Sequence, residues 1–186
     1  MKKLIAGINM TLDGVCDHTA VAPDDEVHEH YSELLRSGDA ILYGRTTYQL
    51  MEYWRDLVAN PSGNKASDEF AIIMNNISKV VFSHTLKSVD WKSARLATKS
   101  LEEEILELKQ QPGKDIFVGS PGLIVQAMNL GLVDELQLMV HPVIAGKGMK
   151  LFKDIHDRSE LKLIKTKTFG CGAVILYYEP GKSHET

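Results

Sequence analysis

The 186 residues are 44% apolar and 25% charged, a composition that is typical of a folded globular chain with one sizeable core and excludes a disordered one. The 21 Lys and Arg residues against 25 Asp and Glu give a net charge of −4 without a basic cluster, so we expect no nucleic acid among the partners. The uncharged window 116–133 is interrupted by Pro121 and three glycines, and the apolar stretch after Met1 ends at Asn9, so we expect neither a membrane partner nor a signal peptide.

Short apolar runs alternate along the chain with segments of helical periodicity, which is the pattern of an α/β domain. Strands are predicted at 4–8, 40–44, 79–83, 94–97, 115–119, 136–140, 161–169 and 173–178. Helices are predicted at 27–35, 46–54, 70–77 and 101–108, with a last one that starts at Pro121 and stops at Gly131. No repeat or linker divides the chain, so we expect a single domain over 1–180, a mixed sheet of about eight strands and a C-terminal tail at 181–186.

Two strand-to-helix junctions are candidates for binding phosphate. The first, 42–48, contains Gly44-Arg45-Thr46-Thr47, and the second, 116–123, contains Gly119-Ser120-Pro121-Gly122-Leu123. A glycine at the strand end lets the chain turn closely, and the helix that follows offers free N–H groups to an anion. Two such junctions together indicate a nucleotide with more than one phosphate group, although each alone could be an ordinary helix start. The G-x-G-x-x-G fingerprint is absent, which disfavours a Rossmann domain.

Other constellations carry weaker signals. The run Asn9 to Gly14 follows the first strand and could face a pocket or simply form a turn, since Asp-Gly is a common turn pair. His28-Glu29-His30 lacks the H-E-x-x-H spacing of a metal site and is interpreted as a solvated helix face, so no metal is expected. Two isolated cysteines, Cys16 and Cys171, form no C-x-x-C motif and favour a reducing, cytoplasmic compartment.

Four segments resemble the dihydrofolate-reductase-like superfamily, and more narrowly the reductase domain at the C-terminus of the bifunctional riboflavin-biosynthesis deaminase-reductase. They are Thr11-Leu12-Asp13-Gly14, the strand and turn at 39–48, the strand Val80-Val81-Phe82-Ser83, and the stretch Gly131-Leu132-Val133-Asp134-Glu135-Leu136 with the glycine-rich 142–148. The order and spacing of these motifs carry the resemblance as far as about Phe152.

The resemblance implies a three-layer α/β/α fold of dihydrofolate-reductase type, NADPH as cofactor and hydride transfer to a small pteridine- or pyrimidine-like molecule. It implies that the cofactor is bound by Met10, Thr11, Gly44, Arg45, Thr46, Thr47, Ser83, Gly119, Ser120, Gly122 and Leu123. Arg45 would favour NADPH, and Asp13 would face the substrate as the catalytic candidate. Family members often pair, so a homodimer is possible.

The chain departs from the riboflavin enzyme at one substrate position. Val118 stands where that family has a glutamate of the substrate site, and the zinc signature of the deaminase half is absent. Dihydrofolate reductases carry an acid on their first helix, for which Asp24, Asp25 and Glu29 remain open. A diverged dihydrofolate reductase and a non-catalytic nucleotide-binding module are therefore the alternatives to a stand-alone NADPH-dependent reductase.

Overall fold

The computed structural model describes residues 1–181, which fold around one eight-stranded sheet. The strands lie in the order β4-β3-β2-β5-β1-β6-β8-β7. Their bounds are β1 Leu4–Thr11, β2 Gly38–Gly44, β3 Ser78–Phe82, β4 Ala94–Leu96, β5 Asp115–Val118, β6 Glu135–His141, β7 Leu161–Thr168 and β8 Val174–Pro180. β1 through β6 pair in parallel, and β8 runs antiparallel to both β6 and β7. The predicted mixed α/β sheet of dihydrofolate-reductase type is confirmed.

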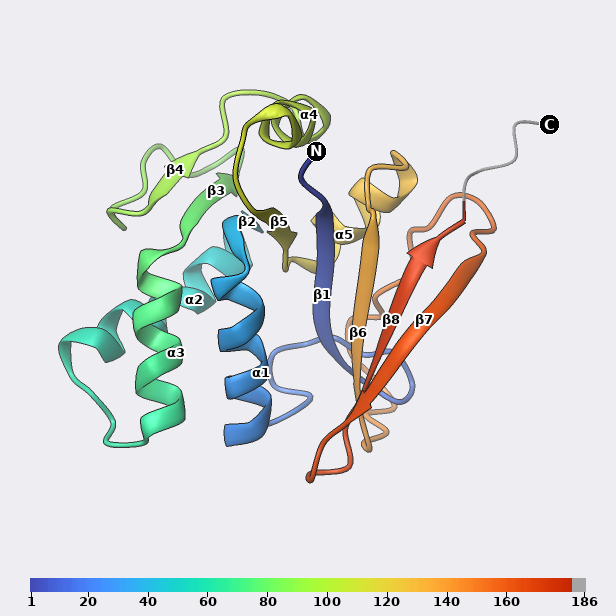
Figure 1. Ribbon diagram of the computed structural model, residues 1–186, viewed down its shortest axis with the longest axis horizontal. Coiled ribbons are helices and arrows are strands. Elements are labelled where there is room, and N and C mark those ends of the chain that lie inside the picture. The colour runs from blue at the N-terminus through green and yellow to red at the C-terminus, as the bar shows by residue number, and fades with distance from the viewer. Residues whose placement is uncertain (182–186) are drawn as a thin grey trace.

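Helices cover both faces of the sheet (Figure 1). Their bounds are α1 Asp25–Arg36, α2 Arg45–Ala59, α3 Lys65–Asn76, α4 Leu101–Gln110 and α5 Pro121–Asn129. Successive side chains of β1 point to opposite faces of the sheet. Leu4 packs with α4 and α5 in one core, whereas Ile5 packs with α1, α2 and α3 in the other. The three predicted layers are therefore present.

Each predicted strand and helix is found, and the differences concern their ends. α2 continues five residues past the predicted end at Trp54, and α3 begins five residues before Phe70. Most of the added residues are polar, so hydrophobic periodicity could not reveal these turns. Asn64 caps α3 by accepting from the Ser67 backbone N–H, which fixes the start of the helix after the 60–64 loop.

The sheet edge formed by β6, β8 and β7 has a small core of its own. Val27 of α1 packs there against Met139, Phe169 and Ile175. Of the predicted tail, only Gly181 lies within the described residues, and the division into one domain and a tail stays a prediction. Within the described residues, every helix is too short or too polar to cross a membrane.

Candidate active site

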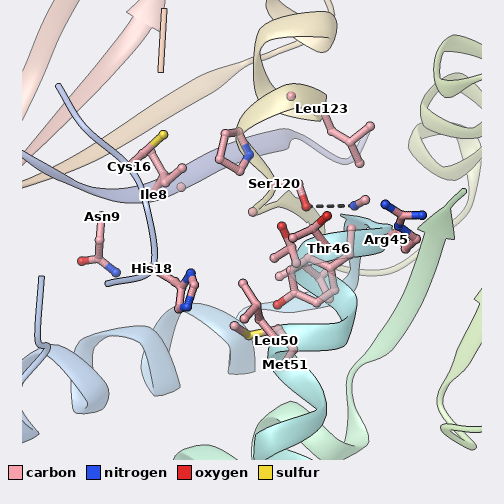
Figure 2. Close-up of a pocket in the computed structure, with 18 of the residues that line it drawn as sticks. Ile8, Asn9, Cys16, His18, Arg45, Thr46, Leu50, Met51, Ser120 and Leu123 are labelled. Atoms are coloured by element: carbon pink, nitrogen blue, oxygen red, sulfur yellow. Dashed lines mark hydrogen bonds between the residues drawn. The ribbon is translucent and has the colours of Figure 1, made fainter. Parts of the chain in front are cut away.

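A cavity of about 940 Å³ opens where the chain leaves the carboxyl ends of β1, β2, β3 and β5. In open α/β sheets this is the edge at which ligands bind. Figure 2 shows the cavity between two groups of residues, with Arg45, Thr46, Ser120 and Leu123 on one side and Asn9, Cys16 and His18 on the other. We call the first group the phosphate end. The aromatic end comprises the second group together with the rings of His28, Tyr31, Trp54 and Phe70, which also line the cavity.

One hydrogen bond joins the two glycine junctions at the phosphate end. The Gly44 backbone N–H donates to Ser120 Oγ at 2.8 Å, drawn as a dashed line in Figure 2. Because β2 and β5 are paired, the starts of α2 and α5 lie next to each other beside the cavity. The two junctions, each predicted to bind phosphate, are therefore neighbours beside one cavity.

The five helices differ in how their first turns are capped. α1, α3 and α4 are capped by the side chains of Asp24, Asn64 and Ser100. α2 and α5, which start at the cavity, have no side-chain cap, because Gly44 has no side chain and the Ser120 hydroxyl accepts from Gly44 instead. Free N–H groups and the positive end of two helix dipoles therefore face the cavity, an arrangement that attracts anions.

A cation and several hydroxyls complete the phosphate end. Arg45 Nη1 donates to Thr85 Oγ1 at 2.8 Å, and the Ser83 hydroxyl accepts from the backbone N–H groups of Thr85 and Leu86. These bonds hold the turn after β3 against the start of α2. The Arg45 side chain remains exposed at the mouth of the cavity and can reach a phosphate there.

Aromatic side chains from α1, α2 and α3 form the opposite end. The Trp54 ring lies edge-on to Phe70, with 4.6 Å between ring centroids, and His28 is edge-on to Trp54 at 5.5 Å. Burial among these rings lowers the pKa of His28, so the imidazole is neutral near pH 7. Asn9 at the end of β1 is held by a 2.9 Å contact between its Oδ1 and His141 Nε2.

The interpretation of His28-Glu29-His30 as a solvated face is wrong for both histidines. His28 lines the cavity, and His30 is 8% exposed and packs edge-on against Phe169. Only Glu29 is exposed. Because α1 packs against both α3 and the sheet, the two imidazole rings are covered on its inner sides and are buried as aromatic groups. In the part of the chain that the structure describes, no cluster of His, Cys, Asp or Glu has the geometry of a metal site.

Most of the residues predicted to bind the cofactor line this cavity. They are Gly44, Arg45, Thr46, Thr47, Ser83, Gly119, Ser120, Gly122 and Leu123. Met10, Thr11 and Asp13 do not line it. Thr11 is fully buried, and its hydroxyl donates to Asp13 Oδ1 and accepts from the Val15 backbone N–H.

Asp13 connects two loops. Its carboxylate accepts from the backbone N–H groups of Ala145 at 3.0 Å and Gly146 at 2.9 Å, and so ties the turn after β1 to the loop after β6. The hydrogen bond from Thr11, together with these two backbone bonds, holds the pKa of Asp13 well below its ordinary value. Val118 is also outside the cavity lining, since it is 1% exposed in the core and paired with Ala6.

The aromatic end could not be found from the sequence. Leu50 and Trp54 are four residues apart on α2 and share a face, but an apolar face at this spacing also describes ordinary core packing. Asn9 lines the cavity, which agrees with one of the two interpretations left open for the run from Asn9 to Gly14, a pocket or a turn.

Comparison with known proteins identifies the family. The family model of the RibD C-terminal domain matches residues 2–175. The chain belongs to this family. It is 34% identical over 185 residues to the protein YyaP of Bacillus subtilis, covering 95% of this chain and 94% of that one.

Several solved structures share the fold. A putative riboflavin biosynthesis protein from Shewanella superposes with a TM-score of 0.73 at 18% identity, over 97% of this chain and 99% of that one. A pyrimidine reductase-like protein from Corynebacterium diphtheriae gives 0.66 at 16% identity, over 98% and 93% of the two chains. A bifunctional deaminase and 5-amino-6-(5-phosphoribosylamino)uracil reductase from Thermotoga maritima also gives 0.66 at 16% identity; the match covers 97% of this chain and 57% of the longer enzyme.

Proposed function

We propose that this member of the RibD C-terminal family is an NADPH-dependent reductase that transfers hydride to a pteridine- or pyrimidine-like small molecule in the cytoplasm. The observation that carries the proposal is the pair of uncapped helix starts joined by the bond from Gly44 to Ser120. The reductase named among the structural relatives agrees with it.

The residues at the phosphate end fit the diphosphate of a dinucleotide. A Cβ atom built on Gly122 meets no other atom within 4 Å, so the space beside the start of α5 is open to a ligand. The first-turn N–H groups of α2 and α5 and the hydroxyl of Thr46 would hold the phosphate oxygens. Arg45, with Thr85 beside it, would hold the additional phosphate that distinguishes NADPH from NADH.

Bound here, NADPH would supply the hydride for a reducible ring or a carbon–nitrogen double bond. The chain itself has to orient the substrate, exclude water and hold a proton. Among the described residues, Asp17 is the carboxylate that lines the cavity, and its Oδ2 accepts from the Met149 backbone N–H at 3.0 Å. We therefore assign proton transfer to Asp17 and loop anchoring to Asp13.

The partners proposed are a small-molecule substrate and a second copy of the chain, not nucleic acid. Leu163 and Ile164 of β7 are 50% and 46% exposed at the edge of the sheet, and an apolar surface at such an edge supports pairing. Light scattering of the purified protein measures its oligomeric state directly.

Cofactor preference tests the proposal. Arg45→Ala removes a cation and its charge-assisted hydrogen bonds, so we expect NADPH affinity to fall by roughly 10-fold or more while NADH affinity changes little. Arg55→Ala is the matched control, because Arg55 is on the same helix but pairs with Asp90 outside the cavity lining. Titration of both cofactors into the three proteins measures the effect. Unchanged NADPH affinity in Arg45→Ala contradicts the role given to Arg45.

A further inference from the structure

Formal charge is distributed unevenly in the cavity. Of the Lys and Arg residues that the structure describes, only Arg45 lines it, and Arg45 is at the phosphate end. At the aromatic end, the charged residue in the lining is Asp17, which is negative. It lies between Cys16 and His18 on the loop drawn in Figure 2. An anion at this end would therefore find no guanidinium or ammonium partner.

Polar atoms without partners are present at the same end. Within residues 1–181, His28 Nδ1 and the Tyr31 hydroxyl are buried and make no hydrogen bond. They are three residues apart on α1, and both residues line the cavity. Leaving such groups unpaired costs free energy, and the enclosed positions of these two atoms impose that cost on the empty protein.

The remaining surface of this end is mostly apolar. Trp54, Phe70 and His28 pack edge to face, and Leu50 and Met51 of α2 extend the surface toward Thr46, as Figure 2 shows for the labelled side chains. Rings and aliphatic side chains of this kind favour a planar ligand. Asn9, held through its Oδ1 by His141, adds an amide at the rim.

We propose that the aromatic end binds an uncharged planar heterocycle and discriminates against ligands that carry a phosphate or carboxylate tail. This inference rests on the proposed function, because it names the substrate class of the same reductase site. The heterocycle would stack on the apolar wall and hydrogen-bond to His28 and Asn9. An anionic tail placed there would lose its hydration against aromatic rings and be repelled by Asp17.

The inference separates this chain from two possible substrate classes. A phosphoribosyl-pyrimidine needs cations for its phosphate beyond those that bind the cofactor, and dihydrofolate has a tail with two carboxylates. Arg45 is the one lining guanidinium among the described residues and is already committed to the cofactor end. The expected substrate is the ring alone, with hydride added to the carbon of a C=N bond, a proton added to its nitrogen and NADPH released as NADP⁺.

Binding of two flavin probes tests the inference without requiring turnover. Lumichrome is an uncharged tricyclic ring, and FMN carries a closely related ring with a ribityl phosphate. In the presence of saturating NADP⁺, we expect lumichrome to bind at least about 10-fold more tightly than FMN, measured by quenching of probe fluorescence. Equal binding, tighter binding of FMN, or no binding of lumichrome overturns the inference.

A charge placed at the aromatic end should change the preference. Leu50 lines the cavity, whereas its neighbour Gln49 is exposed outside the lining. We expect Leu50→Arg to raise FMN affinity at least about 5-fold relative to lumichrome, and Gln49→Arg to leave the ratio unchanged. A wild-type ratio in a folded Leu50→Arg variant counts against the inference, and if that variant does not fold, the wild-type ratio alone decides.

The two proposals fail in different ways. Absence of NADPH binding together with selective lumichrome binding contradicts the cofactor assignment but not the character of the aromatic end. NADPH binding with equal affinity for both flavins contradicts only the substrate class.

Discussion

The two ends of the cavity are built from different parts of the chain. The phosphate end consists of backbone N–H groups at two strand-to-helix junctions, with Arg45 and a few hydroxyls beside them. The rings of the aromatic end are side chains of α1, α2 and α3. They line the cavity because these three helices pack together. Backbone donors recognise a phosphate with little dependence on side chains, whereas the shape and charge of the aromatic end depend on each residue there. In the proposed function, the first end would therefore determine the cofactor class, and the second would determine which substrate is accepted.

The largest expected effect is a block of the phosphate end. Gly122→Asp places a carboxylate in the open space beside the first turn of α5, where it repels phosphate, so we expect NADPH affinity to fall by about 100-fold or more. An acidic residue in a first turn also stabilises the helix, by about 0.5 kcal/mol, so the fold is retained. Titration with NADPH and thermal unfolding measure the two effects.

Gln126→Asp is the control for this variant. Gln126 is exposed on the same helix and does not line the cavity, so its replacement adds the same charge and leaves NADPH binding unchanged. If Gly122→Asp still binds NADPH as the wild type does, the diphosphate is not held at α5.

A smaller effect is expected behind the aromatic end, where α1 meets β8. Burial lowers the pKa of His30 to about 4 from an ordinary value of 6.5. Between these pH values the unfolded chain takes up a proton that the folded chain does not, so stability falls as the pH drops through this window. By pH 5 this amounts to roughly 2 kcal/mol.

His30→Leu should remove this share of the acid sensitivity. The free energy of unfolding of the variant, measured with denaturant at pH 7 and pH 5, is expected to fall less than that of the wild type. The exposed His156, replaced by Leu, is the control and should leave the pH dependence as it is. Equal pH dependence in wild type and His30→Leu would show that His30 is protonated within the fold.

The smallest effect on turnover is expected at Asp13, which lies outside both ends of the cavity. Asp13→Ala removes the bonds to Ala145 and Gly146 that tie two loops together, so we expect a lower midpoint of thermal unfolding. NADPH affinity and the rate of NADPH oxidation should stay within about two-fold of wild type. Asp17→Ala serves for comparison, since Asp17 lines the cavity and its loss should slow oxidation. A large loss of rate in Asp13→Ala at unchanged stability would restore Asp13 as the proton donor.

The same contrast explains how much could be predicted from the sequence. Strands, helices and the phosphate end have local signals: apolar runs, glycines at strand ends, and Thr46 and Thr47 after Arg45. The uncapped start of α2 also follows from sequence, since Gly44 has no side chain. The uncapped start of α5 does not, because the Ser120 hydroxyl is engaged by Gly44 only through the pairing of β2 with β5.

The aromatic end has no local signal. Trp54 and Phe70 have the spacing of core residues, and His28 and His30 looked solvated because their neighbours Asp25, Glu26 and Glu29 are charged. The packing of α1 against α3, and of His30 against Phe169, shows that these rings are covered. The position of Asp13 likewise depends on tertiary structure, because its backbone partners Ala145 and Gly146 are more than a hundred residues away in the chain.

The most direct test of the central claim is a fluorescence titration of the wild-type protein with NADPH. The account predicts saturable binding of one NADPH per chain with a dissociation constant in the micromolar range, and loss of that binding in Gly122→Asp. A folded wild-type protein that does not bind NADPH would contradict it, and would show that the fold and its two open helix starts are retained without the cofactor.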